Sequence, residues 1–347
     1  MKIPACTETR RRMVFWNRLF ASFALLGIIC AAASPAWSGA AAGLWIAGQG
    51  FNEIDEVLPN QRKHSGTVTP IILNGSSIDE PCGVCFDKSK NLWVTGFGGT
   101  VLEFTPAQLR KLRTTPNPTP VVTITSSSFK DTVGCTFDKN WNLWVVDGNA
   151  RGVHEVSKAQ LNAGSADITP AITVTSVATL LFPNFATFDK SGNLWITEKF
   201  NDKIVKFTPN QLTSSGDKSP AIVLSDNGSG SLDEPGQPAF DGKGNLWVPN
   251  FGNSTVVMFK NSDLGASGSP TPGVTLSNAS VMSSQSLDGP WGLAFQGKGG
   301  LWISNFYSGN ISKFIPSQIK VSGSPVPKVF IQGIASEMYQ ITFGPLF

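Results

Sequence analysis

A Leu-Trp pair recurs six times along the chain at nearly constant spacing. The six tryptophans are separated by 48, 51, 51, 52 and 55 residues, and they are Trp45, Trp93, Trp144, Trp195, Trp247 and Trp302. A period of this length is typical of a repeat protein, in which each unit buries its faces against its neighbours. We therefore expect residues 41–347 to form one domain, although their number would ordinarily suggest two.

Most Leu-Trp pairs end a hairpin signature. Four copies run from Phe-Asp through a polar turn to Leu-Trp, at 86–93, 137–144, 188–195 and 240–247, and a fifth at 295–302 has Gln296 in place of Asp. Two apolar runs around a segment rich in Asp, Lys, Gly and Asn predict a β-hairpin. We interpret the aspartates as structural, because Asp at a turn start accepts backbone N–H groups, and each turn has too few oxygen ligands for an EF-hand-type metal loop.

Further signals complete each repeat. A third apolar segment follows the Trp strand, and capping boxes that begin at Thr105, Ser157 and Thr208 predict one helical turn after it. A fourth β-rich segment follows a Thr-Pro or Ser-Pro pair, where proline suits an outer strand because it cannot donate to a central ladder. Four antiparallel strands without a long helix describe a propeller blade.

The two ends of the repeat region complement each other. The first repeat begins at Gly43 without a preceding Phe-Asp strand, whereas residues 339–343 supply such a strand and the chain then ends. We expect the C-terminal strand to complete the N-terminal blade. The predicted fold is thus an all-β six-bladed β-propeller with four antiparallel strands per blade, closed by that strand.

Residues 1–40 do not belong to the repeat and have the pattern of a signal peptide. Basic residues up to Arg18 precede an apolar run at 19–33, and small residues at 38–40 suit cleavage. The sequence therefore predicts export to a periplasm or to the exterior, through the Sec route or, given the twin-arginine-like run at 9–14, the twin-arginine route. The apolar run is short for a bilayer span, so we expect no stable membrane span after cleavage.

Charge and cysteine content limit the partners. Residues 1–40 hold five basic and one acidic side chain, which leaves 22 basic and 23 acidic groups in the mature part. A net charge near zero gives no electrostatic footprint for nucleic acid. The mature cysteines are Cys82, Cys85 and Cys135, and no second C-x-x-C pair exists to hold zinc. A disulfide that uses Cys135 and free buried cysteines are both compatible with the sequence.

Two sets of residues are expected at one face of the disc, where the loops that enter the first strand and those that join the second to the third emerge. The first set comes from three Asp-x-Pro segments, and carboxylates that converge there would suit Ca²⁺. The candidate metal ligands are Glu80, Asp233, Glu234 and Asp288. The alternative is that Asp-x-Pro only shapes a turn.

The second set is aromatic. Phenylalanines follow five of the Leu-Trp strands, and polar residues lie beside several of them. The candidate ligand-binding residues are Phe51, Phe97, Phe200, Phe251 and Phe306, with Glu198, Asn250 and Asn305. A partly exposed aromatic ring flanked by amides suits a carbohydrate, peptide or protein partner, whereas buried rings would only fill space between blades.

The repeat pattern Pro-x-Gly-Val/Leu-x-Phe-Asp-x-x-Gly-Asn-Leu-Trp-Val resembles NHL-type and related six-bladed propellers over essentially the whole mature chain. Residues 194–198 and 201–204 also resemble streptogramin-lyase-like repeats. Gluconolactonase-type propellers are a third resemblance, but their Glu-Gly-Pro pattern is not reproduced. These resemblances imply a fold that hosts binding proteins, lactonases and lyases alike.

Catalytic motifs are scarce in this chain. It has only two histidines, His64 and His154, and neither has metal-ligand spacing to another histidine. The favoured hypothesis is a monomeric, exported, non-catalytic module that binds a ligand or protein through its loop face. The alternatives are a Ca²⁺-type metal-dependent lactonase or hydrolase, with the metal as Lewis acid, and a streptogramin-lyase-like enzyme.

Overall fold

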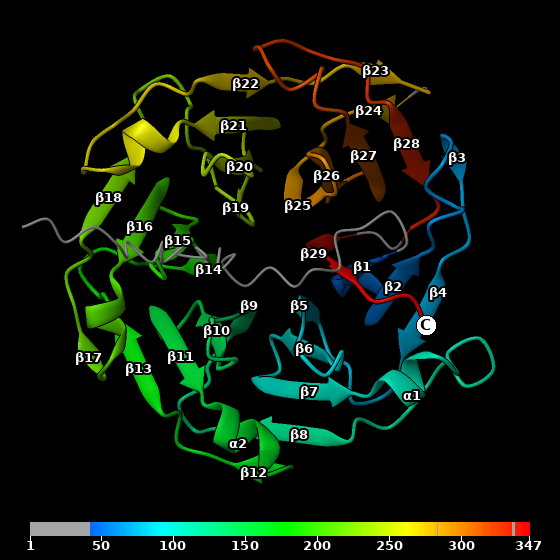
Figure 1. The fold of residues 1–347 in the computed structure, drawn as a ribbon, viewed down its shortest axis with the longest axis vertical. Helices are drawn as coiled ribbons and strands as arrows, with labels where there is room; N and C mark the ends of the chain where they lie inside the picture. The colour runs from blue at the N-terminus through cyan, green and yellow to red at the C-terminus, as the bar shows by residue number, and fades with distance from the viewer. Residues whose placement is uncertain (1–41, 283, 335–336) are drawn as a thin grey trace, which may run out of the picture. The chain divides into compact units, whose positions relative to one another are not determined.

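The computed structural model describes residues 42–282, 284–334 and 337–347, and nearly all of their regular structure is β-strand. Most strands belong to six sheets, blades 1 to 6, each built on antiparallel strands and arranged around a common centre (Figure 1). The predicted six-bladed propeller is confirmed. The predicted signal peptide lies outside the described residues. No helix in the described part of the chain is long and apolar enough to cross a membrane.

The first three blades have the same inside-to-outside strand order. Blade 1 consists of β29 (Met338–Gly344), β1 (Gly43–Gly48), β2 (Glu53–Val57) and β4 (Ile71–Asn74). Blade 2 consists of β5 (Pro81–Phe86), β6 (Leu92–Gly96), β7 (Thr100–Phe104) and β8 (Val122–Thr125). Blade 3 consists of β9 (Thr132–Phe137), β10 (Leu143–Asp147), β11 (Gly152–Val156) and β13 (Ile172–Thr175).

The other three blades repeat this order. Blade 4 consists of β14 (Pro183–Phe188), β15 (Leu194–Glu198), β16 (Lys203–Phe207) and β18 (Ile222–Ser225). Blade 5 consists of β19 (Ala239–Phe240), β20 (Leu246–Asn250), β21 (Thr255–Phe259) and β22 (Val274–Leu276). Blade 6 consists of β25 (Pro290–Gln296), β26 (Gly300–Asn305), β27 (Asn310–Phe314) and β28 (Val329–Gln332).

Blade 1 is assembled from both ends of the described chain. The C-terminal strand β29 pairs antiparallel with β1, with Phe343 opposite Leu44 and Ile341 opposite Ile46. Figure 1 shows the red C-terminal strand beside the blue N-terminal strands. The predicted closure of the ring by the C-terminal strand is therefore confirmed.

The hairpin aspartates hold both the turn and the tryptophan that follows it. In blade 4, Asp189 accepts hydrogen bonds from the backbone N–H groups of Ser191 and Asn193, from the Asn193 side chain and from the Trp195 indole. Asp87, Asp138 and Asp241 accept the equivalent tryptophan hydrogen bond in their blades, and Gln296 replaces Asp in blade 6. The structural interpretation of these aspartates is thus confirmed.

The six repeated tryptophans are buried between blades. Each belongs to a separate hydrophobic cluster shared by two neighbouring blades, and five of them contact the phenylalanine of the next hairpin edge to face, as Trp195 does with Phe240. Burial of about 200 Å² of indole removes roughly 5 kcal/mol of unfavourable hydration per tryptophan. These residues hold the ring together.

Short helical turns follow the third strands of blades 2 to 5. They are α1 (Pro106–Leu109), α2 (Lys158–Asn162), η2 (Pro209–Leu212) and η3 (Asn261–Leu264). Thr105, Ser157 and Thr208 make the capping boxes predicted from the sequence. A further turn, η1 (Gln49–Phe51), joins β1 to β2.

Five blades have an addition that strand propensity does not predict. A segment of the next blade lies parallel to their outer strand, either as one of the two-residue strands β3 (Gly66–Thr67), β12 (Ala166–Asp167) and β17 (Gly216–Asp217) or as a single bridge. In each case a serine hydroxyl accepts the N–H of the outer strand: Ser65, Ser165, Ser215, Ser267 and Ser322. In blade 1, the N–H of Asn74 bonds to Pro116 of blade 2. A small hairpin, β23 (Ser280–Val281) and β24 (Ser284–Gln285), was not predicted either.

Cys85 and Cys135 form a disulfide between the inner strands of blades 2 and 3, while Cys82 is a buried free thiol. Of the two alternatives that the sequence allows, the structure thus has the disulfide that uses Cys135. The bond joins blades 50 residues apart in sequence.

Candidate functional site

The inner strands give the channel two chemically different ends. At the loop end lie the loops that enter the inner strands and those that join second and third strands. At the hairpin end lie the turns between first and second strands. In blade 2, for example, Pro81 lies opposite Gly96 at the loop end and Phe86 lies opposite Leu92 at the hairpin end.

Aromatic side chains fill the loop end of the channel. Trp291 of β25 and Phe185 of β14 are buried there with Cys82 and Val133, and further rings pack against them: Phe97, Phe182, Phe251, Phe306 and Tyr339. The ring centroids of Phe251 and Trp291 are 4.5 Å apart, edge to face. We call this group the axial cluster.

The sequence candidates divide by their distance from the repeated tryptophan. Phe97, Phe251 and Phe306 stand four residues after it and belong to the axial cluster. Phe200 and Phe51 stand five and six residues after it, and each is 62% exposed. Phe200 packs on Phe182 at 5.5 Å. A phenylalanine four residues after the tryptophan therefore packs in the axial cluster, whereas one five or six residues after it faces solvent.

The three polar candidates lie beneath the surface and position loops. Glu198, Asn250 and Asn305 are the last residues of their second strands and are fully buried. The Glu198 carboxylate accepts the N–H groups of Phe182, Phe200 and Asn201, and the two asparagines each accept one N–H from the loop before the inner strand. The expectation that amides flank an exposed aromatic ring is thus corrected, because these side chains are occupied within the fold.

The candidate metal ligands do not form one group. Glu80 lies in blade 2, Asp233 and Glu234 in blade 5, and Asp288 in blade 6. Within the described ranges, no three or more His, Cys, Asp or Glu side chains are arranged to hold a metal ion. The expected convergence of these carboxylates at one channel mouth is therefore not seen.

The Asp-x-Pro segments instead make a tight turn. Their middle residues have positive φ, 42° at Glu80, 47° at Glu234 and 61° at Gly289. The N–H of each middle residue bonds to a side chain of the preceding blade: Asn52, Asp202 or Ser254. Asp-x-Pro thus shapes a turn, as the alternative interpretation expected, and the turn also links neighbouring blades, which the sequence did not indicate.

Lysine takes the place of phenylalanine in blade 4. Lys199 stands four residues after Trp195, and its N–H bonds to the preceding loop as do those of Phe97, Phe251 and Phe306. Its Nζ lies 4.9, 5.3 and 5.7 Å from three ring centroids and 3.4 Å from a carboxylate oxygen. These groups, which we call the ammonium cage, are Trp291, Phe251, Phe200 and Glu234.

Further acidic residues lie near Glu234 of the ammonium cage. Asp233 adjoins Glu234, and burial together with the charges of Asp202, Glu234 and Asp226 raises the pKa of Asp233. The Asp202 carboxylate also accepts the Glu234 N–H. Four carboxylates thus gather at this part of the loop end.

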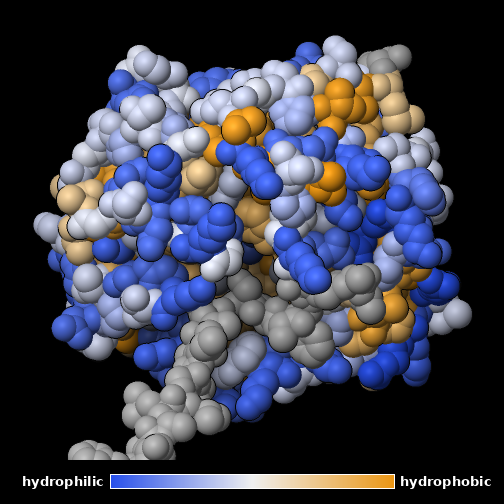
Figure 2. All heavy atoms as spheres, turned by 45° about the horizontal axis from the view of Figure 1, so that its top comes forward, coloured by the Kyte–Doolittle hydropathy of each residue, from blue (hydrophilic) through white to orange (hydrophobic). Residues whose placement is uncertain are grey.

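The loop end also carries most of the exposed apolar surface. Ten large hydrophobic side chains are exposed in the described residues, and six of them lie in these loops: Phe51, Val177, Leu181, Phe200, Met282 and Tyr307. Elsewhere such residues are scattered, and on the face drawn in Figure 2 hydrophobic side chains form small separate groups among hydrophilic ones. A concentration of exposed apolar side chains is typical of an interaction surface.

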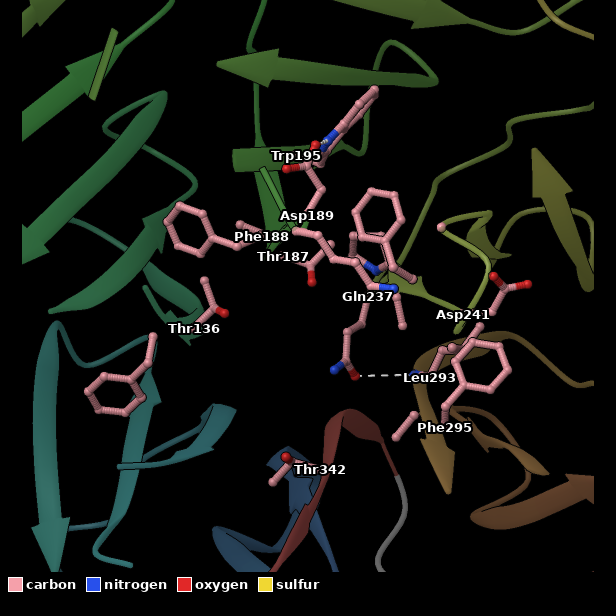
Figure 3. Close-up of a pocket in the computed structure, with 18 of the residues that line it drawn as sticks. Thr136, Thr187, Phe188, Asp189, Trp195, Gln237, Asp241, Leu293, Phe295 and Thr342 are labelled. Atoms are coloured by element: carbon pink, nitrogen blue, oxygen red, sulfur yellow. Dashed lines mark hydrogen bonds between the residues drawn. The ribbon is translucent and has the colours of Figure 1, made fainter. Parts of the chain in front are cut away.

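A cavity of about 780 Å³ opens at the hairpin end. Six phenylalanines and the hairpin turns line its mouth, and deeper in the wall three threonines come from blades 3, 4 and 1 (Figure 3): Thr136, Thr187 and Thr342. Gln237 and Gln340 also line it. Each accepts two backbone N–H groups and donates to one carbonyl of neighbouring inner strands, as Gln237 does with Leu293 and Ile341. These glutamines therefore tie blades together across the channel.

His154 has a structural setting within blade 3. It is buried, its Nδ1 lies 3.0 Å from the Thr173 hydroxyl, and its Nε2 lies 3.5 Å from Asp147. Burial alone would raise the pKa of Asp147, but hydrogen bonds from His154 and from backbone N–H groups lower it. Neither side chain reaches solvent, so this pair has no access to a substrate.

Sequence reasoning missed Lys199, Trp291 and Tyr307. Lys199 could have been found by aligning the repeats on their tryptophans, since it replaces a phenylalanine there. Tyr307 stands at the same position as Phe200 and is 63% exposed. Trp291 lies on an inner strand at a position that varies between blades, so no repeat signal indicates its role.

Comparison with known proteins identifies the fold and no family. No family model matches this chain, and no curated protein sequence matches it. A chain from a nidogen/laminin complex is similar in structure, with a TM-score of 0.61 and 13% identity over 87% of this chain and 98% of that one. A Bacteroides caccae protein of unknown function has a TM-score of 0.57 and 13% identity over the same shares. A streptogramin B lyase has a TM-score of 0.50 and 14% identity over 74% of this chain and 70% of that one.

Proposed function

We propose that this protein is an exported, non-catalytic binding module that engages a protein or peptide through the loop end of its propeller. The observation that carries the proposal is the gathering of exposed apolar side chains around the axial cluster, which gives a surface of rigid aromatic anchors. Aromatic side chains of this kind dominate the binding energy of protein interfaces. The NHL-type resemblance of the repeats agrees with a binding role.

A protein or peptide partner is favoured over a carbohydrate. Sugars are bound by aromatic stacking together with several free polar groups, but Glu198, Asn250 and Asn305 use their oxygens on backbone N–H groups. The large hydrophobic side chains that remain exposed at the loop end include the rings of Phe51, Phe200 and Tyr307. Such a surface suits apolar and cationic side chains of a polypeptide.

Binding is also favoured over the metal-dependent hydrolase. The candidate carboxylates belong to separate turns at the loop end, whereas the cavity opens at the hairpin end. Fold similarity does not choose between the two, because the similar structures include both a lyase and a chain from a protein complex. The Cys85–Cys135 disulfide supports export, since disulfides persist in oxidising compartments.

Selection of phage-displayed random peptides on the purified mature protein tests the proposal. Enriched peptides should bind the wild type and lose at least about tenfold in affinity with the double variant Phe200→Ala/Tyr307→Ala, about 1.4 kcal/mol. The matched control is Val121→Ala/Val326→Ala, which removes exposed apolar side chains outside the loop end. Equal binding by both double variants, or no enrichment on the wild type, would refute the proposed role of this surface.

A further inference from the structure

We propose that the ammonium cage is a binding site for an organic ammonium group of a partner, and that Lys199 fills this site in the free protein. The inference rests on the proposed function and specifies the chemical group, an organic ammonium, that a partner peptide presents to the loop end. A lysine side chain, a methylated lysine or an N-terminal amine would each supply such a group.

The geometry is that of a cation site. The Nζ of Lys199 lies within 6 Å of the centroids of three aromatic rings, and a carboxylate oxygen of Glu234 lies 3.4 Å away. The negative faces of aromatic rings attract a cation at such distances, and proteins recognise quaternary ammonium ligands with cages of this composition. The cage draws its walls from blades 4, 5 and 6, so its shape is set by the ring of blades rather than by one flexible loop.

The fold does not require lysine at this position. Blades 2, 5 and 6 have phenylalanine there and blade 3 has Gly148, whose N–H makes the equivalent bond to the preceding loop. The backbone of Lys199 is therefore held independently of its side chain. With 25% of its side chain exposed, Lys199 can swing into solvent while the walls of the cage stay in place.

The charge around the cage favours an additional cation. The carboxylates of Asp202, Asp226 and Glu234 all lie close enough to act on that of Asp233. A group of carboxylates beside Glu234 favours the approach of a cationic group from a partner. The exposed ring of Phe200 gives that group a path from solvent.

Competition by Lys199 makes a quantitative prediction. A tethered group that occupies a site lowers the apparent affinity of a free ligand in proportion to the fraction of molecules in which the site is vacant. Removal of the Lys199 side chain should therefore tighten the binding of a free ammonium compound, whereas loss of a residue that merely packs would not.

Calorimetric titration at constant ionic strength tests this with choline and with its neutral isostere 3,3-dimethyl-1-butanol. Lys199→Ala should bind choline at least about tenfold more tightly than the wild type, and it should not bind the isostere. Lys199→Phe restores the residue of the other blades, fills the cage with a ring and should abolish choline binding. Lys206→Ala is the matched control, since the Lys206 ammonium lies 5.1 Å from the Trp195 ring outside the cage.

Choline binding by Lys199→Ala that is no tighter than wild type would overturn the inference, as would equal binding of the isostere. Should Lys199→Ala fail to fold, Lys199→Gln, which keeps most of the chain length without the charge, decides by the same criterion. The titration contains no peptide, so its failure leaves the peptide selection to stand on its own. Failure of the selection likewise leaves the choline result intact.

Discussion

Replacement of Asp189 by alanine is expected to destabilise the protein by about 3 kcal/mol. The Asp189 carboxylate accepts four hydrogen bonds, at 2.9 and 3.0 Å from the N–H groups of Ser191 and Asn193, at 2.7 Å from the Asn193 side chain and at 2.9 Å from the Trp195 indole. The donors differ in access to water, and that difference sets the size of the effect.

The indole contributes most, because Trp195 is only 2% exposed. A buried donor that loses its partner costs about 1–3 kcal/mol, whereas the half-exposed turn donors can bond to water and cost about 0.5 kcal/mol each. Blade 1 lacks the aspartate, and the Trp45 indole nitrogen has no hydrogen-bond partner among the described residues. The ring therefore tolerates one such defect, and Asp189→Ala should fold with reduced stability.

Urea unfolding followed by circular dichroism measures the loss. A decrease of about 3 kcal/mol shifts the midpoint by roughly 1 M without a change in slope. Asp79→Ala, at an exposed loop aspartate, should shift the midpoint very little. Asp189→Asn should lower the free energy of unfolding nearly as much as Asp189→Ala when its side-chain NH2 faces the indole N–H, because two donors cannot form a hydrogen bond. A loss below about 1 kcal/mol for Asp189→Ala would refute the assignment of stability to these turn carboxylates.

Three further changes test other parts of the fold. Burial and the Asp87 charge raise the pKa of Glu103 to about 7, so the folded state favours the protonated acid and loses stability as pH rises from about 4.5 to 7. Glu103→Gln should therefore raise the free energy of unfolding at pH 8 by about 1 kcal/mol, after allowance for solvent screening, and change it little at pH 4.5. An equal effect at both pH values would contradict this. Cys85→Ala/Cys135→Ala removes a link across 50 residues and should cost about 4 kcal/mol relative to oxidised wild type in oxidising buffer. Reduced wild type should match the variant, and a variant as stable as oxidised wild type would contradict this. Gln340→Leu removes the hydrogen-bond partner of the Val84 and Cys135 N–H groups and of the Cys135 carbonyl. Hydrogen exchange at the two amides should therefore become faster, and unchanged protection would show that they find other partners.

The repeat made most of the fold predictable from the sequence. Hairpin turns, capping boxes and ring closure each have local signals, and every blade repeats them, so a single ambiguous segment is corrected by its counterparts. The two-residue outer strands had no such signal, because two residues show no periodicity. Their serines, such as Ser165 and Ser215, do recur before the fourth strand, but a serine in a polar linker looks like any turn residue.

The candidate site was predictable only in part. The aromatic loops were found, but whether a ring packs or faces solvent depends on one residue of register, which separates Phe251 from Phe200. The polar candidates failed because a strand-end side chain such as Asn305 is as suited to bonding a neighbouring backbone as to bonding a ligand. Carboxylates in similar turns of different blades stay apart, since each turn lies on its own sector of the ring.

The cover of each outer strand by the following blade has a consequence for how the chain must be made. A newly synthesised blade keeps an unpaired edge until the next blade emerges, and blade 1 needs β29, which follows blade 6 in the sequence. Bare strand edges are the templates on which chains aggregate. A product that stops within the ring would therefore present at least one unpaired strand edge, whereas the complete ring covers the outer strands of five blades. Nonsense or frameshift products are expected to precipitate rather than accumulate as partial propellers.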